Sequence, residues 1–350
     1  MQLSIIIPVI NERSTLPGLL TSLAGQRGVD FEVLLVDGGS DDGTPALAQE
    51  LAASQSYPLQ VLHAPRGRAH QLNAGAAQAG SELLLFLHAD SLFVAPDALA
   101  CGVALLSAAV AARLPAAARF ALRFCRSEVD SAFGYYFHET KARLDRPGCI
   151  HGDQGLLLTR PAFTAAGPFD SALPLAEDTV FADRVRDLCG WQLVPAELYT
   201  SARRFEREGL RARQTLNALL LNFVAIGWGD FFAAAPAVYR LQGENPRLDL
   251  RPWWQLIEGL LATMNWRQRW RLLWQTGHYV RGNAWQLAFY LDVRQHYRRR
   301  LSPGSGQLLW LTGFDRYCSP ILNNPLATLA AAVLTRSWFI LTGWRLARSE

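Results

Sequence analysis

The sequence predicts an α/β protein with a doubly wound, mostly parallel sheet, followed by a C-terminal α-helical extension. Short apolar runs alternate with segments of helical period through the first half of the chain, as in successive βα units. These runs are apolar throughout, which favours a sheet covered on both faces. Later segments are helical and rich in tryptophan and arginine. With 350 residues, 50% of them hydrophobic, the chain can bury one large core or two ordinary ones.

Four βα units are expected first. The strands are predicted at residues 3–8, 32–37, 60–63 and 83–88, and the helices at residues 15–23, 45–53, 69–79 and 96–112. Further strands are predicted at residues 119–124, 155–159 and 192–194, and further helices at residues 135–144, 179–188 and 210–228. In such sheets ligands bind outside the carboxyl ends of the strands, so the polar residues that follow each strand are the first candidates for a site.

A change of composition marks a predicted domain boundary. After Gly243 the prolines Pro246 and Pro252 interrupt the pattern and tryptophan and arginine become frequent. We therefore expect one domain at residues 1–243 and an extension at residues 244–350. Helices are predicted in the extension at residues 253–274, 284–300 and 326–346, with a turn-rich stretch at residues 302–306.

The segment after the second strand carries the first candidate site. Its sequence is Asp37-Gly38-Gly39-Ser40-Asp41-Asp42-Gly43-Thr44, and a helix is expected to follow. An aspartate at this position can accept a hydrogen bond from a nucleotide base, and glycines allow the backbone to approach a ligand closely. The alternative is an ordinary turn between a strand and a helix.

Together with Pro8-Val9-Ile10-Asn11-Glu12 after the first strand, this segment resembles the opening of family 2 glycosyltransferases, which have the Rossmann-like GT-A fold. The resemblance implies that Asp37 recognises the base, usually uracil. It also implies that Glu12 and Asp42 lie in the same donor pocket, beside Pro8 and Asn11. It covers about residues 1–243.

The segment at residues 65–75 resembles the next part of that family, a loop and helix start on the nucleotide side. Its candidate donor-binding residues are Arg66, Arg68 and Asn73. Guanidinium groups suit a diphosphate because they donate two parallel hydrogen bonds. An exposed surface pair of arginines is the alternative.

His88-Ala89-Asp90 stands at the strand end where GT-A enzymes usually carry D-x-D, whose carboxylates hold a divalent cation. Asp90 can still bind Mg²⁺ or Mn²⁺ together with phosphate oxygens. His88 is either a ligand, better suited to Mn²⁺, or a histidine with a structural role. The departure leaves metal dependence open. The H-A-D variant resembles a bacterial subgroup assigned to arsenosugar-type biosynthesis.

Two later motifs continue the resemblance. His151-Gly152-Asp153-Gln154-Gly155 is similar to an acceptor-side loop, so Asp153 or Gln154 is expected to contact the donor sugar; a self-stabilising loop is the alternative. Glu177-Asp178 opens a predicted helix and resembles the family's E-D motif. The resemblance makes Asp178 the catalytic base, with Glu177 beside it. A helix start that merely complements the helix dipole is the alternative.

Arg203 and Arg204 follow the last predicted strand in an S-x-R-R-[WF]-like element. Either arginine would compensate charge on the departing nucleoside diphosphate. The alternative is a structural salt bridge to Glu206 or Glu208.

These motifs together predict an inverting glycosyltransferase that uses a nucleotide-sugar donor, with a UDP-sugar favoured, and a hydroxyl-bearing acceptor. A degenerate, non-catalytic domain that binds a nucleotide-sugar or scaffolds a complex is the main alternative, supported by His88 in the metal motif. A nucleotidyltransferase would need a glycine-rich phosphate loop after the first strand, where this chain has residues 9–12.

The tail suggests partners of two kinds. From Arg240 to the end there are 15 arginines against six acidic residues, interspersed with tryptophans. This composition fits peripheral docking on a membrane, which would suit a lipid-linked acceptor, or a helical subdomain that buries its tryptophans. Arg336 argues against a membrane span at residues 326–346. Nucleic-acid binding is not expected, because Arg298-Arg299-Arg300 is short and stands alone.

The cysteines and the N-terminus indicate location. Five widely spaced cysteines without a C-x-x-C pair predict neither disulfides nor a zinc site. The N-terminus has no charged segment before an apolar one, as a signal peptide would. We expect a cytoplasmic protein that lies peripherally on the inner face of the membrane.

Overall fold

The computed structural model describes residues 2–127, 133–173, 175–241 and 247–348. The chain folds into two compact units. The first comprises Met1–Val129 and His138–Ala202, and the second comprises Asp130–Phe137 and Arg203–Glu350. The domain boundary predicted at residue 243 lies outside the described residues.

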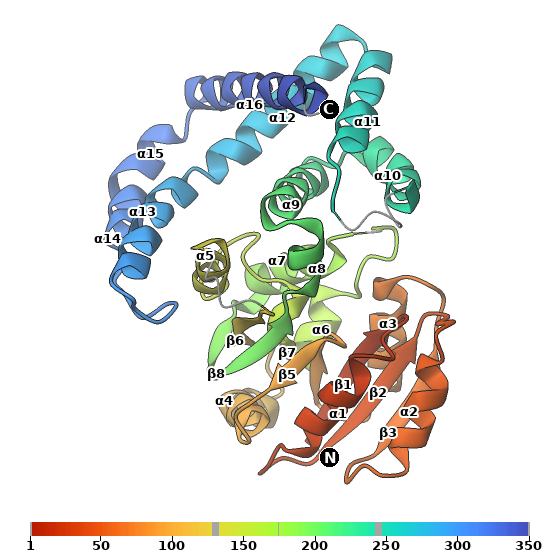
Figure 1. Ribbon diagram of the computed structural model, residues 1–350. Coiled ribbons are helices and arrows are strands. Elements are labelled where there is room, and N and C mark those ends of the chain that lie inside the picture. Colours follow the sequence, from red (N-terminus) through yellow and green to blue (C-terminus); the bar gives the residue numbers. More distant parts are fainter. Residues whose placement is uncertain (1, 128–132, 174, 242–246, 349–350) are drawn as a thin grey trace. The chain divides into compact units, whose positions relative to one another are not determined.

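The first unit is built on one eight-stranded sheet with the order β3-β2-β1-β4-β7-β6-β8-β5 (Figure 1). Its strands are β1 Leu3–Val9, β2 Phe31–Asp37, β3 Leu59–His63, β4 Leu83–Phe86, β5 Ser91–Phe93, β6 Ala117–Cys125, β7 Leu156–Thr159 and β8 Gln192–Ser201. Strands β3, β2, β1 and β4 are parallel to one another, β7 is antiparallel to β4 and β6, and β5 is antiparallel to β8. The predicted doubly wound, mostly parallel sheet with a helical C-terminal region is confirmed.

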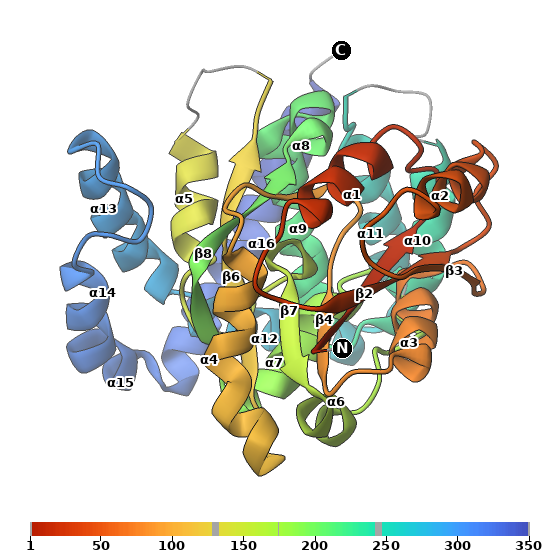
Figure 2. The ribbon, with the colours of Figure 1, turned by 90° about the horizontal axis from the view of Figure 1, so that it is seen from below.

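Helices cover both faces of this sheet. They are α1 Leu16–Ala24, α2 Thr44–Ala52, α3 Arg68–Gln78, α4 Ala98–Ala112, α6 Arg160–Ala166 and α7 Glu177–Cys189, with the 3₁₀ turn η1 Gly152–Gln154. Figure 2 shows α1 and α2 on one side of β1 and β2, and α3 on the other. Alternate residues of β1 enter two separate cores, because successive side chains of a strand point to opposite faces.

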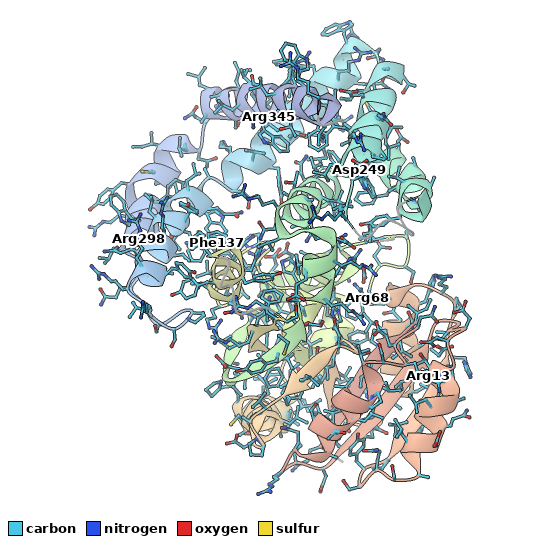
Figure 3. All side chains as sticks on the ribbon, viewed as in Figure 1. Arg13, Arg68, Phe137, Asp249, Arg298 and Arg345 are labelled. Atoms are coloured by element: carbon cyan, nitrogen blue, oxygen red, sulfur yellow. The ribbon has the colours of Figure 1, made fainter. Side chains whose placement is uncertain are left out.

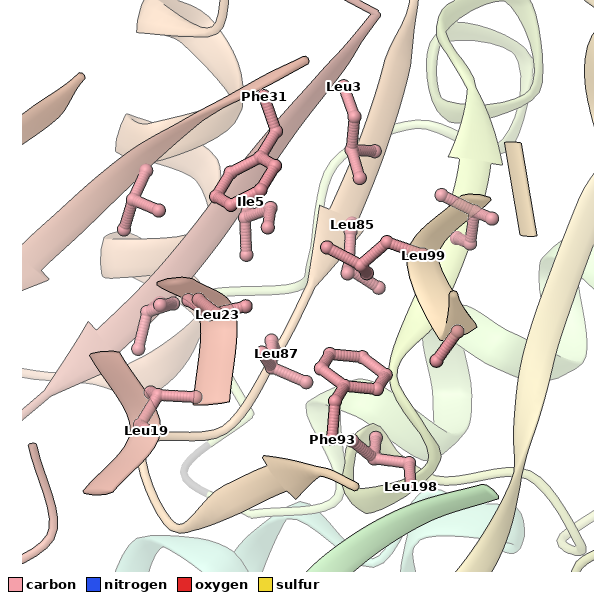
Figure 4. Close-up of a cluster of buried hydrophobic side chains, with 14 of the residues drawn as sticks. Leu3, Ile5, Leu19, Leu23, Phe31, Leu85, Leu87, Phe93, Leu99 and Leu198 are labelled. Atoms are coloured by element: carbon pink, nitrogen blue, oxygen red, sulfur yellow. The ribbon is translucent and has the colours of Figure 1, made fainter. Parts of the chain in front are cut away.

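The core under α1 and α4 is shown in Figure 4, where Ile5, Leu23, Leu85 and Leu99 meet. On the other face α3 approaches β1 very closely at Gly75, where an added Cβ would lie 2.4 Å from Ile6 Cγ2. A glycine in the middle of a helix is otherwise unfavourable, so this close packing explains its presence. It brings the N-terminal end of α3 close to the carboxyl ends of β1 and β2.

Two strands differ from the sequence prediction. Strand β5 was not predicted, and β8 extends to Ser201, well beyond the predicted end at residue 194. Pro195 lies just after the predicted end, and proline cannot donate a hydrogen bond to a sheet. The pairing of β8 with β6 instead becomes irregular there: Leu193 lies opposite Arg119 and Glu197 opposite Ala121. The proline is thus accommodated in a bulge.

The second unit is helical. Besides Phe133–Phe137 at the start of α5 (Phe133–Lys141), it contains α8 Arg203–Glu208, α9 Leu210–Ala225, α10 Gly229–Leu241, α11 Arg251–Thr263, α12 Trp266–Gly282, α13 Trp285–Arg298, α14 Leu309–Gly313, η2 Phe314–Cys318, α15 Ser319–Leu322 and α16 Pro325–Ala347. The single helix predicted at residues 253–274 was wrong. Helix α11 ends before Met264, which is extended. Asn265 then caps the N-terminus of α12 in a reciprocal pair of hydrogen bonds with Gln268.

Helix α16 packs along α12 (Figure 1). The contact is close because Gly277 of α12 has no side chain: an added Cβ would lie 2.6 Å from the Thr328 carbonyl oxygen and 2.7 Å from Ala332 Cβ. Trp254 of α11 stacks on Phe339 with ring centroids 4.9 Å apart, and its indole N–H donates to the Phe339 carbonyl at 3.0 Å. Among the described residues α16 alone is long and apolar enough to cross a membrane, and only 11% of its apolar window is buried.

Candidate active site

The predicted base-recognition turn is held by its own aspartate. Asp37 is 3% exposed at the end of β2. Its carboxylate accepts hydrogen bonds from the Gly39 N–H at 3.0 Å, the Ser40 N–H at 3.2 Å and the Ser40 hydroxyl at 2.5 Å. These bonds fix the turn in one shape, so Asp37 acts first on the backbone of its own loop.

The neighbouring motif after β1 is tied to the same turn. Asn11 has a left-handed backbone, with φ of 55°, a conformation that asparagine tolerates. Its side-chain oxygen accepts the Asp41 N–H at 3.0 Å, and its own N–H donates to Ser40 at 2.9 Å. Glu12 N–H donates to Thr44 at 3.0 Å. Asn11, Glu12 and the turn after β2 are therefore brought together, as the sequence predicts.

Asp42 also serves this loop pair. It accepts from the Thr44 hydroxyl at 2.5 Å and from the N–H of Arg13, which Figure 3 labels, at 3.1 Å. The hydrogen bond from Thr44 is the main reason that the pKa of Asp42 is lowered. Pro8 lies on the same strand end, half-buried in β1. This end of the sheet is a rigid rim of carboxylates and backbone.

Gln71 was not predicted as a site residue, yet it joins the two strands beneath that rim. Its amide donates to the carbonyls of Val9 at 2.7 Å and Val36 at 2.8 Å, and it is 3% exposed. Asn73, predicted to bind the donor, exchanges two hydrogen bonds with the backbone of Phe169, at 2.8 and 2.9 Å. Its amide therefore holds the segment before α7.

Arg66 and Arg68 differ in their surroundings. Arg66 is exposed in the loop before α3. Arg68, at the start of α3 (Figure 3), donates to Glu177 with an Nη1 to Oε1 distance of 3.1 Å. The Glu177 side chain is 3% exposed, whereas that of Arg68 keeps 45% of its surface open. The arginine thus links the nucleotide-side segment to the acidic start of α7 and still presents part of its guanidinium to solvent.

Asp90, Asp153, Glu177 and Asp178 form an acidic cluster. Within it, the carboxylate of Asp178 is held by hydrogen bonds on both of its oxygens. It is 8% exposed and accepts the Gly152 N–H at 2.7 Å on one oxygen and the Thr179 N–H at 2.7 Å on the other. Burial works in the opposite direction, but Arg68, two histidines and the Gly152 N–H together hold the pKa of Asp178 below its ordinary value. Burial and the charge of Asp178 raise the pKa of Glu177. Asp178 is therefore ionised at neutral pH.

Gly152 makes this arrangement possible. An added Cβ would lie 2.5 Å from His88 Nε2 and 2.9 Å from Asp178 Oδ2, closer than real Cβ atoms come to other atoms. His88 at the end of β4 and Asp178 at the start of α7 thus approach the same point from different parts of the chain. Neither the glycine nor this approach was predicted, because the contact joins residues far apart in sequence.

Histidines surround the carboxylate in their neutral form. Burial lowers the pKa of His88 to about 4, helped by Arg68, and lowers that of His151 to about 4. His151 Nδ1 lies 2.7 Å from the Thr179 hydroxyl, beside Asp178. Sequence analysis placed His151 in a motif without giving it a role. A neutral imidazole donates a hydrogen bond from one ring nitrogen and accepts one at the other.

Asp153 is an unusual member of the cluster. Its Oδ1 is buried and has no hydrogen-bond partner among the described residues. Burial, together with the charges of Asp178 and Asp90, raises the pKa of Asp153 to about 7. Gln154 is fully buried, and its amide donates to the Cys149 carbonyl at 2.9 Å. Asp153 therefore faces the acidic cluster, while Gln154 supports the loop.

A small cavity adjoins this cluster in the first unit. It is lined by Leu72, Phe86, Leu87, His88, Gly152, Leu156, Phe169 and Asp178. Its wall is mostly apolar, with His88 and Asp178 as the polar groups. Ala176, just before α7, has φ of 61°, a conformation that costs energy for a residue with a Cβ. This strained residue sets the direction in which Glu177 and Asp178 enter the cluster.

Arg203 and Arg204 belong to the second unit, where they begin α8. Arg204 Nε donates to Glu208 at 3.0 Å one turn later in the helix, which is one of the structural pairs considered from the sequence. The role of the two arginines toward a departing diphosphate stays a prediction.

Comparison with known proteins gives matches to the first part of the chain. Residues 4–111 match the family model Glycosyl transferase family 2. A PGL/p-HBAD biosynthesis glycosyltransferase of Mycobacterium bovis is 40% identical over 99 residues, which are 28% of this chain and 38% of that protein. An undecaprenyl-phosphate 4-deoxy-4-formamido-L-arabinose transferase of Aeromonas hydrophila is 36% identical over 92 residues, 25% of this chain and 28% of that protein. The chain spans well under half the length of these relatives.

A solved structure matches nearly the whole chain. The mannosyltransferase PcManGT from Pyrobaculum calidifontis, in complex with GDP-Man and Mn²⁺, aligns with a TM-score of 0.51 and 19% identity over 90% of this chain and 87% of that one. At this identity the likeness shows the fold, which is of the GT-A type. The family match contains the rim around Asp37 and the arginine Arg68, but it ends before Asp178.

Proposed function

We propose that the protein is a glycosyltransferase that moves a sugar from a nucleotide-sugar donor to a hydroxyl-bearing acceptor. One observation carries this proposal: Arg68, in the segment that resembles a nucleotide-binding one, pairs with Glu177 next to the buried carboxylate of Asp178. In this proposal Arg68 supplies positive charge for the diphosphate and Asp178 is the base for the hydroxyl. The match of residues 4–111 to family 2 glycosyltransferases supports the donor class.

The donor is proposed to bind along the rim formed by the ends of β1 and β2. The rim includes Pro8, Asn11, Glu12, Asp37 and Asp42, with Arg66 and Arg68 toward the phosphates. The turn after β2 is already fixed by hydrogen bonds, so little ordering is needed on binding. A UDP-sugar is favoured, because Asp37 occupies the position that in family 2 proteins recognises uracil.

Asp178 is proposed to be the catalytic base. Its Oδ1 accepts the N–H and the hydroxyl of Thr179, whereas its Oδ2 accepts the Gly152 N–H and keeps a second lone pair with which to take the proton of the acceptor hydroxyl. As that proton leaves, the hydroxyl oxygen bonds to the anomeric carbon and the bond from that carbon to the diphosphate oxygen breaks. Attack opposite to the leaving diphosphate inverts the configuration. General-base assistance of this kind contributes roughly 10²–10⁴-fold.

Mg²⁺ or Mn²⁺ is the proposed cofactor. Among the described residues no group of three or more His, Cys, Asp or Glu side chains is arranged to hold a metal. Mg²⁺ often uses only one or two carboxylates and completes its shell with water and substrate phosphates. The partnerless oxygen of Asp153 and the mutual repulsion of Asp90, Asp153 and Asp178 fit a cation, with Asp90 and Asp153 as the ligands. His88 is then a neighbour or a further ligand. A bound cation would neutralise charge on the diphosphate.

A lipid-linked acceptor and a location at the membrane are also proposed. The Aeromonas relative is named for transfer to undecaprenyl phosphate, so a lipid-linked acceptor at the cytoplasmic face of the membrane is consistent with it. The H-A-D motif at residues 88–90 is the only support for the arsenosugar-type subgroup.

A screen of nucleotide-sugars tests the proposal. The melting temperature of the full chain is measured with UDP-, GDP- and other nucleotide-sugars, each with and without Mg²⁺ or Mn²⁺, because a bound donor stabilises the fold by mass action. Release of the nucleoside diphosphate is then measured for the donors that bind. We expect stabilisation by one donor class and slow hydrolysis in the absence of acceptor. Binding without turnover, with or without candidate acceptors, would favour the non-catalytic alternative, and no binding at all would contradict the proposal.

A further inference from the structure

The outward face of α16 is apolar along its length. Leu326 is 78% exposed, Leu334 70%, Leu341 55% and Trp344 64%. Together with Val333 and Ile340 they fall within about 120° of one another around the axis of a helix with 3.6 residues per turn, which places them on one side of α16. Thr328 and Ala332, on the opposite side, are buried where α16 packs on α12. The helix is thus covered by other protein residues on one side, and its other side is exposed.

A second set of exposed apolar residues lies in the segment before α16. Leu309 is 68% exposed, Trp310 58%, Tyr317 62% and Ile321 72%. The backbone that carries them is firmly held. The Asp292 carboxylate, 1% exposed, accepts the N–H groups of Trp310 at 3.0 Å and Leu311 at 2.8 Å. Burying a carboxylate costs free energy, and this one holds the backbone that carries the exposed side chains. We infer that the fixed positions of these side chains have a function.

Positive charge accompanies both sets. Residues 251–348 contain 13 arginines, no lysine and three acidic residues, and residues 316–348 contain no acidic residue. On a helix with 3.6 residues per turn, Arg336 lies at the border of the outward apolar face of α16, about 80° from its centre. An arginine at that border can extend its guanidinium to lipid phosphates while its stem stays among apolar chains.

The packing of α16 excludes a transmembrane orientation. Its neighbour α12 carries Arg267, Arg269, Arg271 and Arg281, and the two helices run together through the Gly277 contact. A span by α16 would draw these arginines into hydrocarbon, at a cost of about 2.5–3.5 kcal/mol each on insertion scales. A helix lying in the plane of the interface avoids that cost.

A second copy of the chain is a poor partner for the same face. A symmetric dimer through α16 would bring the arginines of both copies, including Arg336, to one interface, and residues 316–348 contain no acidic residue that could balance them. An anionic bilayer can contact both kinds of residue, because its acyl chains can cover the leucines and its negative headgroups can bind the arginines.

We propose that the outward face of α16, together with Leu309, Trp310, Tyr317 and Ile321, is a docking surface for an anionic lipid bilayer, with α16 lying in the membrane plane. These residues are called the membrane face below. The inference rests only on the second unit, and it holds whatever the chemistry of the first.

Vesicle flotation of the full chain tests the membrane face. Vesicles of phosphatidylcholine alone are compared with vesicles that also contain phosphatidylglycerol. Leu334→Glu/Leu341→Glu is the disrupting variant, and Val94→Glu/Leu114→Glu is its control. The exposed fractions match, at 70% and 55% against 70% and 56%, but the control residues lie in the first unit. We expect the wild type and the control to float with phosphatidylglycerol vesicles. The disrupting variant should partition at least tenfold more weakly for each leucine replaced.

Charge and orientation have their own measurements. Arg336→Gln should weaken binding to phosphatidylglycerol vesicles about fivefold and change binding to phosphatidylcholine little. Alkaline carbonate should release the wild type from vesicles, since no segment spans them. Failure of the wild type to float, equal partitioning of the disrupting variant and wild type, or a dimer in solution that Leu334→Glu/Leu341→Glu dissociates would overturn the proposal. Resistance to carbonate would overturn the in-plane orientation. Unchanged circular dichroism of each variant shows that it folds.

Discussion

The acidic cluster in the first unit and the membrane face in the second depart from ordinary protein surfaces in opposite ways. Around Asp178 the chain buries charged groups and provides almost every one of them with a partner. Along the outward side of α16 it leaves large apolar side chains such as Leu326, Leu334 and Trp344 exposed. Buried charge and exposed apolar surface both cost stability. A chain that accepts both costs in separate units has separated a site for chemistry from a surface for location.

Asp153→Asn should produce the largest change in stability. The pKa of Asp153 is raised to about 7, so the folded state binds its proton more tightly than the unfolded state does. Wild-type stability contributed by this group is therefore present at low pH and is lost as the pH rises from about 4 to about 7. The asparagine cannot ionise. The free energy of unfolding of the variant, relative to that of the wild type, should therefore increase by up to about 3 kcal/mol between about pH 5 and about pH 8.

Urea unfolding at the two pH values measures this difference. The buried histidines have lowered pKa values and lose stability as the pH falls from about 6.5 to about 4, but they do so equally in both proteins. They cancel in the comparison. Parallel pH profiles of variant and wild type would show that Asp153 is not strained by its acidic neighbours.

Gly152→Ala should disturb the cluster without adding charge. The new methyl group would press on His88 Nε2 and Asp178 Oδ2 and displace the carboxylate. Displacement of a catalytic group by about 1 Å costs roughly 100-fold in rate, so donor turnover should fall by that order. Gly18→Ala is the control, since its Cβ would meet only Leu92, at 3.7 Å. Equal turnover of the two variants would separate Gly152 from catalysis.

Gly277→Ala probes the support of the membrane face. Its Cβ would meet backbone atoms of α16 at 2.6 and 2.9 Å, so the two helices must separate. We expect a loss of about 2 kcal/mol in the free energy of unfolding. Gly259→Ala in α11 meets nothing within 4 Å and should instead stabilise by up to about 1 kcal/mol through helix propensity. Calorimetry measures the change in stability of each variant relative to the wild type. Changes of the same sign for both variants would contradict the close packing of α12 and α16.

Arg204→Ala should have the smallest effect. Its ion pair with Glu208 joins neighbouring turns of one helix, and the arginine side chain is 48% exposed. Such pairs contribute about 0.5 kcal/mol or less. A larger loss in thermal stability would mean that Arg204 has another partner. A loss of turnover with unchanged stability would support its predicted role toward the diphosphate.

The contrast between the two units also shows what sequence can predict. The strands of the first unit were predictable because each is a short apolar run bounded by turn residues, and the polar residues after them fell where a parallel sheet gathers them. The positions of Asp37 and Asn11 at the ends of two neighbouring strands were predicted in this way. The contact of Gly152 with His88 and Asp178 was not, because no local pattern links residue 88, residue 152 and residue 178.

The second unit was less predictable for a different reason. Hydropathy identifies α16 as an apolar helix but not which side is covered, since the packed and the outward sides are both apolar. Only the packing of Gly277 on Ala332 distinguishes them. The break between α11 and α12 was missed because the N-cap Asn265 stands among residues that otherwise favour helix.

The most direct test of the central claim compares Asp178→Asn with Asp187→Asn, an equal change nine residues away on the exposed side of the same helix. Both are assayed for sugar transfer or donor hydrolysis at saturating donor, with donor affinity measured separately by calorimetry. If Asp178 is the base, Asp178→Asn should lose about 10²–10⁴-fold in turnover while still binding the donor, and Asp187→Asn should keep both. Undiminished turnover by Asp178→Asn would contradict the account.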